Sequence, residues 1–251
     1  MLKLRVMPTL LYKENTLVKG VNFASDRRCG SALQSLKVYN RREVDELVFL
    51  DIVATSAGRP PDFTLIDELA DECFMPMTVG GGVSKPEHIG QLLAVGADKV
   101  AVNSAALANP SLIVEGARLY GKQCIVASID VRRESNDWRV YSHSGQQPTS
   151  YDAVSWAREA ESLGAGEILL TSIDRDGTMK GYDVEITRRV TAAVSIPVIA
   201  SGGAGEFAHM AEVLRDGGAS AVSAASIYHF TQKTPLEAKK YLQAEGFNVR
   251  L

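Results

Sequence analysis

The chain has 251 residues, of which 45% are apolar and 23% are charged, as in ordinary soluble globular proteins. Its formal net charge is −3, so no basic excess points to nucleic acid or to an anionic membrane surface as a partner. The three cysteines lie far apart, and no apolar run reaches the roughly 18 residues of a spanning helix, so neither a disulfide framework, nor a zinc site, nor a membrane span is indicated. We therefore expect a cytoplasmic protein without a metal or other cofactor.

Eight short β-rich segments alternate with longer segments of helical spacing. Several of the predicted strands are continuous apolar runs, which is typical of parallel strands buried on both faces. Such alternation predicts right-handed βαβ units and therefore an α/β protein, a single (βα)8 TIM barrel over residues 1–251. The predicted strands are Lys3–Leu10, Glu46–Asp51, Met75–Val79, Lys99–Val102, Cys124–Asp130, Glu167–Ser172, Pro197–Ser201 and Ala221–Ala224, and the clearest helices are 62–72, 85–96, 150–164 and 205–218.

The sequence repeats itself at an offset of 121 residues. The run that starts at Glu46 recurs at Glu167, the glycines 81–82 recur at 202–203, and the run from Gly96 recurs from Gly217. Such self-similarity favours two stacked half-barrels over the alternative of a doubly wound open sheet.

Residues 131–147 interrupt the alternation. Asn136 and Asp137 lie between two short β-like runs there, which predicts a β-hairpin inserted in the fifth βα loop. Trp138 in this hairpin is expected to have an exposed packing role rather than a ligand contact.

Glycines and small polar residues follow the third, fourth, seventh and eighth predicted strands. Gly81-Gly82 and Gly202-Gly203 lie just past a strand, where backbone N–H groups can approach an anion without interference from a Cβ. Asn103-Ser104 and Ala225-Ser226 follow the neighbouring strands, where a helix N-terminus adds its positive dipole end. One glycine pair alone would indicate only a tight turn. Two pairs in register predict two phosphate sites across the barrel mouth, and hence a ligand with a phosphate at each end.

Seven segments together resemble the cyclase subunit of imidazole glycerol phosphate synthase, the HisF family. The resemblance runs nearly end to end, and its most specific part is the run IDRDGT at 173–178. By this resemblance, Thr171, Asp176, Gly177 and Ser201 join the phosphate-binding set. The segments are 44–52 (VDELVFLDI), 78–83 (TVGGGV), 96–106 (GADKVAVNSAA), 109–113 (NPSLI), 164–183 (GAGEILLTSIDRDGTMKGYD), 196–205 (IPVIASGGAG) and 248–251 (NVRL).

The resemblance also implies a partner. In the HisF family a HisH-like glutaminase forms a heterodimer with the barrel at its N-terminal face, and its ammonia passes through the barrel to a ribulosyl bis-phosphate ligand on the opposite face. Asp98 is expected to face this partner. Four charged residues are expected to form the ammonia gate, namely Arg5, Glu46, Lys99 and Glu167. The alternative is a salt-bridged plug of the barrel bottom.

The resemblance fails at one catalytic position. The family uses two aspartates, at the ends of strands one and five, as general acid and general base. Asp130 matches the second, and Lys19 matches a substrate-positioning lysine, but the first position is Leu11. Leucine cannot exchange a proton, and losing such a group costs about 10²–10⁴ in rate. Asp51 and Asp176 are the neighbouring carboxyl groups that could substitute for it.

Three interpretations follow from this pattern. The chain is a diverged HisF-like subunit that serves an amidation in surface-sugar biosynthesis, a histidine-pathway cyclase with relocated acid chemistry, or a non-catalytic conduit that activates its glutaminase. We favour the first, because HisF-like paralogues of that kind are similar in having an apolar residue in place of the first aspartate.

Overall fold

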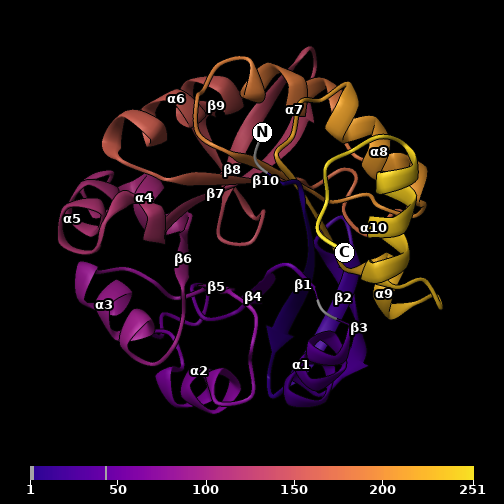
Figure 1. Ribbon diagram of the computed structural model, residues 1–251. Coiled ribbons are helices and arrows are strands. Elements are labelled where there is room, and N and C mark those ends of the chain that lie inside the picture. The colour runs from indigo at the N-terminus through magenta and orange to yellow at the C-terminus, as the bar shows by residue number, and fades with distance from the viewer. Residues whose placement is uncertain (1–2, 43) are drawn as a thin grey trace.

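The computed structural model describes residues 3–42 and 44–251. Eight of its strands pair in parallel to form a closed ring, and helices surround this ring (Figure 1). In chain order the elements are β1 (Arg5–Lys13), β2 (Thr16–Val21), β3 (Ala24–Gly30), α1 (Ala32–Arg41), β4 (Leu47–Asp51), α2 (Phe63–Ala70), β5 (Met77–Gly80), α3 (Pro86–Ala94), β6 (Lys99–Val102), α4 (Ser104–Ala108), α5 (Ser111–Tyr120), a 3₁₀ turn (Lys122–Cys124), β7 (Ile125–Glu134), β8 (Asp137–Ser142), β9 (Gln147–Asp152), α6 (Ala153–Leu163), β10 (Glu167–Ser172), α7 (Val184–Thr191), β11 (Val198–Ser201), α8 (Phe207–Arg215), β12 (Ala221–Ala224), α9 (Ser226–His229) and α10 (Pro235–Ala244).

The ring closes through parallel pairing on every side. Strand β1 pairs with both β4 and β12, and β7 pairs with β10. The remaining neighbours pair in the order β4–β5–β6–β7 and β10–β11–β12. Each predicted strand overlaps one ring strand, and the four clearest predicted helices contain α2, α3, α6 and α8. The predicted TIM barrel of the α/β class is therefore confirmed.

Strand β10 shows why the ring strands read as continuous apolar runs. Ile168 and Leu170 pack outward in the core shared with the helices, whereas Leu169 packs inside the barrel. Because both faces are buried, the hydrophobic effect selects apolar residues on both. We call the side chains packed inside the barrel the inner layer, which consists of Met7, Val48, Ala101, Val126, Leu169, Ile199 and Ala221.

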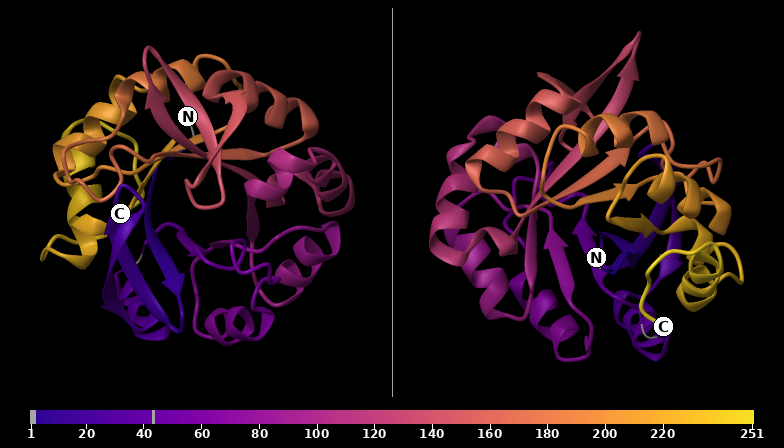
Figure 2. Two further views of the ribbon diagram at one scale, coloured as in Figure 1. Left: turned by 180° about the vertical axis from the view of Figure 1, so that it is seen from behind. Right: turned by 45° about the horizontal axis from the view of Figure 1, so that its top comes forward.

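Two hairpins extend the ring at its C-terminal side. The antiparallel pairing of β7 with β8 falls at the predicted insertion, 131–147, and β8 pairs in turn with β9, which extends past the predicted end to Asp152 (Figure 2). The other hairpin, β2–β3, pairs with the end of β1 and was not predicted. No helix among residues 3–42 and 44–251 combines the length and apolar character needed to cross a membrane.

The prediction for Trp138 was wrong. Its side chain is fully buried, and Nε1 donates a hydrogen bond of 2.8 Å to Asp183 just before α7. The guanidinium groups of Arg133 and Arg189 both stack on its ring. Burial of Trp138 thus fastens the β7–β8 hairpin to the α7 side of the barrel.

The internal repeat needs one correction. Strand β11 follows β5, and α8 follows α3, at the predicted offset of 121 residues, but β12 follows β6 at an offset of 122. The turn before β12 contains Gly217 and Gly218, and Gly218 has a left-handed φ of 68°. One residue is therefore added in this turn, and Ser226 rather than Ala225 is the counterpart of Ser104 at a helix start.

Candidate functional site

A cavity of about 510 Å³ lies at the C-terminal ends of the ring strands. In a TIM barrel this is the face on which loops of different strands meet and build a site. All fourteen residues predicted to be catalytic or phosphate-binding line it, namely Lys19, Gly81, Gly82, Asn103, Ser104, Asp130, Thr171, Asp176, Gly177, Ser201, Gly202, Gly203, Ala225 and Ser226. Their proximity in space is thereby established, whereas their roles in binding stay predictions.

The first glycine pair, Gly81 and Gly82, forms one end of the cavity, and we call it the first-half clamp. Both glycines have positive φ angles, 107° and 72°. A Cβ on Gly82 would lie 2.6 Å from the backbone oxygen of Arg59, so no other residue fits here. The guanidinium of Arg59 contacts the carboxylate of Asp51 at 2.6 Å.

The second pair, Gly202 and Gly203, forms the opposite end, and we call it the second-half clamp. These glycines also have positive φ angles, 88° and 112°. A Cβ on Gly203 would lie 2.1 Å from the backbone oxygen of Gly181. Nearby, Ser226 lines the cavity with a buried Oγ that has no hydrogen-bond partner. A buried hydroxyl without a partner is costly unless a ligand satisfies it.

The β2–β3 hairpin brings Lys19 into the cavity. The side chain of Lys19 is almost fully buried, and its Nζ forms an ion pair with Asp176. The two backbones also meet, because a Cβ on Gly177 would lie 2.1 Å from the backbone oxygen of Gly20. The backbone N–H of Asn22 donates a further hydrogen bond of 2.8 Å to the backbone oxygen of Asp176. The hairpin therefore rests on the β10–α7 loop with its lysine directed inward.

Asp130 has the most clearly perturbed acid–base properties in the cavity. Burial, with a further contribution from the nearby Asp176 carboxylate, raises the pKa of Asp130 to about 7, against a 2.8 Å hydrogen bond from Asn103 that opposes the shift. Burial also raises the pKa of Asp176, although Lys19 opposes this. A carboxyl group with a pKa near 7 can both give and take a proton near neutral pH.

The position opposite Asp130 in the predicted mechanism lacks an acid. Leu11 lines the cavity with an apolar side chain. Asp51, one of the two suggested substitutes, is held by Arg59 and accepts hydrogen bonds from the backbone N–H groups of Val53 and Ala54 at 3.1 and 3.0 Å. Its hydrogen-bonding capacity is thus used within the β4–α2 loop. Asp176 is the carboxyl group that remains in electrostatic contact with Asp130.

The turn between β8 and β9 reaches toward the middle of the ring (Figure 2). The backbone N–H of His143 donates a 2.9 Å hydrogen bond to Ser104 Oγ, and Ser144 Oγ donates one of 2.7 Å to the backbone oxygen of Ile52. Three consecutive residues of this turn, 143–145, have left-handed φ angles of 51°, 55° and 77°. Ser104 thus accepts a bond from this turn, and its hydroxyl proton stays available to a ligand.

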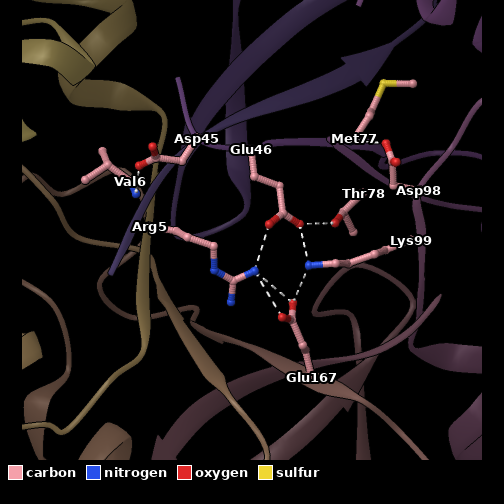
Figure 3. A network of polar contacts seen from close by, with 9 residues as sticks. All are labelled: Arg5, Val6, Asp45, Glu46, Met77, Thr78, Asp98, Lys99 and Glu167. Carbon is pink, nitrogen blue, oxygen red and sulfur yellow. Dashed lines mark hydrogen bonds and ion pairs between the residues drawn. The ribbon is translucent and has the colours of Figure 1, made fainter. Parts of the chain in front are cut away.

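The opposite end of the barrel is closed by charged side chains, which we call the floor ring (Figure 3). Arg5 Nη1 lies 2.7 Å from a carboxylate oxygen of Glu46 and 3.0 Å from one of Glu167. Lys99 Nζ lies 2.9 and 3.0 Å from the same two carboxylates. Burial opposes the charge of Arg5, but the Glu167 and Glu46 carboxylates outweigh it and raise the pKa of Arg5. Four side chains of alternating charge, joined by four ion pairs, therefore surround the barrel axis.

Asp98 lies exposed on the same face as the floor ring, outside the barrel interior. One of its carboxylate oxygens accepts a 2.8 Å hydrogen bond from the backbone N–H of Met77 (Figure 3). The structure thus gives Asp98 a local role at the start of β5 and leaves its predicted partner contact a prediction.

One comparison with known proteins bears on this geometry. The model of the histidine biosynthesis protein family matches residues 5–234, which include every strand of the ring. The chain belongs to this family. Members of the histidine biosynthesis protein family are TIM-barrel isomerases and cyclases, and the site described above lies where such a barrel builds its chemistry.

Several residues that line the cavity were not predicted from the sequence as site residues, among them Phe23, Arg59, Lys85, His88 and Ser144. A signal for His88 was present, since His209 follows it at the repeat offset of 121. Within the described part of the chain, no three His, Cys, Asp or Glu side chains gather in a way that would hold a metal ion.

Proposed function

We propose that the chain is a HisF-like synthase subunit that binds a ligand with a phosphate at each end and takes ammonia from a HisH-like glutaminase partner. The observation that carries this proposal is the pairing of two glycine clamps at one end of a barrel with a four-charge floor ring at the other. A purely structural barrel bottom is normally closed by apolar layers. The clamps account for the ligand class, and the floor ring accounts for the route of the nucleophile.

The inner layer supports the transfer of neutral ammonia. It lies between the floor ring and the cavity, and its seven side chains are all apolar, with alanine at 101 and 221. An ammonium ion would lose its hydration there at a cost of several kcal/mol, whereas neutral NH₃ would lose far less. Exposed Asp98 lies on the floor-ring face, where the partner would dock.

Leu11 supports a reaction other than ordinary cyclisation. Asp130 is suited to exchange protons near neutral pH, but Leu11 can neither donate nor accept one. The ligand-binding and ammonia-handling parts would then serve a separate acceptor, and we propose an amidation in surface-sugar biosynthesis. The cavity would hold the phosphorylated ligand, and Lys19 would position it from the β2–β3 hairpin.

A second candidate is the cyclase of imidazole glycerol phosphate synthase with a relocated acid. Its support is the electrostatic contact between Asp130 and Asp176 inside one cavity. In that case Asp176 would replace the missing carboxyl group at position 11. The third hypothesis is a non-catalytic conduit that activates its glutaminase. Such a conduit would need neither Asp130 nor Asp176 for chemistry.

The deciding experiment supplies the ribulosyl bis-phosphate with ammonium salt to the purified chain and follows ligand consumption. The favoured proposal predicts binding with little turnover by the wild type, and turnover at least about tenfold higher for Leu11→Asp. Turnover by the wild type that Asp176→Asn abolishes would favour the relocated cyclase. Failure of the ligand to bind would refute the hypothesis that the two clamps hold its two phosphates.

The partner needs a separate test. A HisH-like glutaminase should co-elute with the chain and gain glutaminase activity, and Asp98→Lys should weaken the complex. Glu14→Lys, at the β1–β2 turn on the opposite face, is the matched charge reversal and should leave the complex intact. Equal effects of the two variants would argue against docking on the floor-ring face.

A further inference from the structure

The two glycine clamps are followed by helices that carry opposite charges at equivalent positions. Lys85 is the N-cap residue of α3, and Glu206, 121 residues later, is the N-cap residue of α8. Three residues further on, both helices have a histidine, His88 in α3 and His209 in α8. Each histidine accepts backbone N–H bonds at its helix start through Nδ1, from Ser84 at 3.3 Å in the first case and from Glu206 at 3.2 Å in the second. The repeat therefore keeps the histidine contact at the helix start and inverts the charge of the N-cap residue.

The cavity reaches these residues on one side only. Lys85 and His88 line it next to the first-half clamp, whereas Glu206 and His209 do not. The β10–α7 loop covers the second side, because a Cβ on Gly205 would lie 2.1 Å from the backbone oxygen of Met179. The first-half end of the cavity is thus open toward its N-cap residue, and the second-half end is covered.

The charges around the cavity reinforce this difference. Among the described residues, three lysines and arginines line the cavity, and two of them are paired, Lys19 with Asp176 and Arg59 with Asp51. Lys85 is exposed and forms no ion pair within the described chain. On the other side, Glu206 forms an ion pair with Lys233, and neither of these two residues lines the cavity.

We infer that the two clamps bind phosphate unequally, with the first-half clamp, beside Lys85 that is unpaired in the described chain, binding the solvent-facing phosphate of the ligand more tightly. The second-half clamp holds its phosphate through backbone N–H groups and the buried Ser226 hydroxyl. A ligand with two different phosphorylated ends would therefore enter in one orientation. This inference rests on the proposed function and adds the orientation in which the two-phosphate ligand binds between the clamps.

The test uses inorganic phosphate as the probe and reads each clamp separately. In the ¹⁵N-labelled full chain at low ionic strength, backbone amide shifts of Gly81 and Gly82 report the first-half clamp, and those of Gly202 and Gly203 report the second. The first pair should saturate at a lower phosphate concentration. Lys85→Gln should weaken binding at the first pair by about fivefold and leave the second pair unchanged, since one exposed ion contact contributes up to about that factor.

Two matched variants complete the design. Lys240→Gln removes the same charge from an exposed position on α10, away from the cavity, and should change neither clamp. Glu206→Gln, at the equivalent position of the second half, should change neither clamp, because Glu206 does not line the cavity. Equal affinity at the two clamps, or equal effects of Lys85→Gln and Lys240→Gln, would overturn the inference alone. If neither glycine pair responded to phosphate, the proposed function would fail with it.

Discussion

Glu46 is the residue on which the floor ring depends most. Its side chain is only 4% exposed, compared with 12% for Glu167, and it accepts from Arg5, from Lys99 and from Thr78 Oγ1 at 2.7, 2.9 and 3.0 Å. Glu46→Gln keeps the size of the side chain and one acceptor oxygen but removes the charge. The floor ring would change from two positive and two negative groups to two positive groups and one negative group.

The expected cost follows from these contacts. Removing one member of a fully buried ion pair costs about 3–5 kcal/mol, and a hydrogen bond to a charged group contributes about 1.5–3 kcal/mol. Because Arg5 and Lys99 are about one-fifth exposed, solvent offsets part of the loss. We therefore expect Glu46→Gln to lower the free energy of unfolding by about 2–3 kcal/mol, and the more exposed Glu167→Gln to lower it by about 1–2 kcal/mol.

Urea unfolding at pH 7, followed by circular dichroism, measures both values from the shift in midpoint at constant slope. A second series in about 1 M salt should reduce the difference between wild type and variants only slightly, since buried pairs are weakly screened. A cost below about 0.5 kcal/mol for Glu46→Gln, or a larger cost for Glu167→Gln, would refute the view of the floor ring as a partly buried, mutually dependent network.

Three further predictions concern single features. Asp130→Asn should make the protein more stable than the wild type by about 2 kcal/mol at pH 8 but not at pH 4. The reason is that the pKa of Asp130 is raised, so the stabilising protonated form of this carboxyl group is lost as the pH rises from 4 through 7. Urea unfolding at each pH measures the difference in stability. Gly203→Ala should cost about 3 kcal/mol through a left-handed φ and a clash with a backbone oxygen, whereas Gly246→Ala, with a φ of 87° and open space around it, should cost about 1 kcal/mol in the same assay. Lys239→Met should cost about 3 kcal/mol because it leaves buried Asp45 without its 3.2 Å partner, and adding Asp45→Asn should recover part of that loss.

Each of these predictions has an outcome that contradicts it. A stability difference between wild type and Asp130→Asn that does not change between pH 4 and 8 would mean that Asp130 titrates near its ordinary pKa. Equal costs for the two glycine variants would mean that the backbone around Gly203 yields to a methyl group. Additive losses in the Lys239 and Asp45 double variant would mean that the two side chains do not interact.

The barrel could be predicted from the sequence because its strands are buried on both faces. Residues 124–127, for example, are apolar at every position, and glycines or small polar residues follow the third, fourth, seventh and eighth strands. The clamps could be predicted for a related reason, since Gly82 and Gly203 occupy positions where a backbone oxygen excludes any Cβ. In both cases a local requirement determines the residue type.

The β2–β3 hairpin could not be predicted in the same way. Its register shifts near Val18 and Lys19, and Val21 is 45% exposed, so no regular alternation of buried and exposed residues marks it. The burial of Trp138 and the engagement of Asp51 depend on partners that are distant in sequence or on loop geometry. The floor ring was predictable only through the family resemblance, because its members lie up to 162 residues apart.

The origin of the floor ring limits how freely the two halves of this barrel can be exchanged. Arg5, Glu46 and Lys99 lie before the middle of the chain, and only Glu167 lies after it. A symmetric barrel assembled from two copies of the N-terminal half would bring four cations and two carboxylates to the same narrow opening. Two copies of the C-terminal half would bring two carboxylates and no arginine or lysine from these positions. Only the mixed pairing is electrically neutral there, so charge balance at the opening selects the heterologous combination of halves when fragments of this chain reassemble.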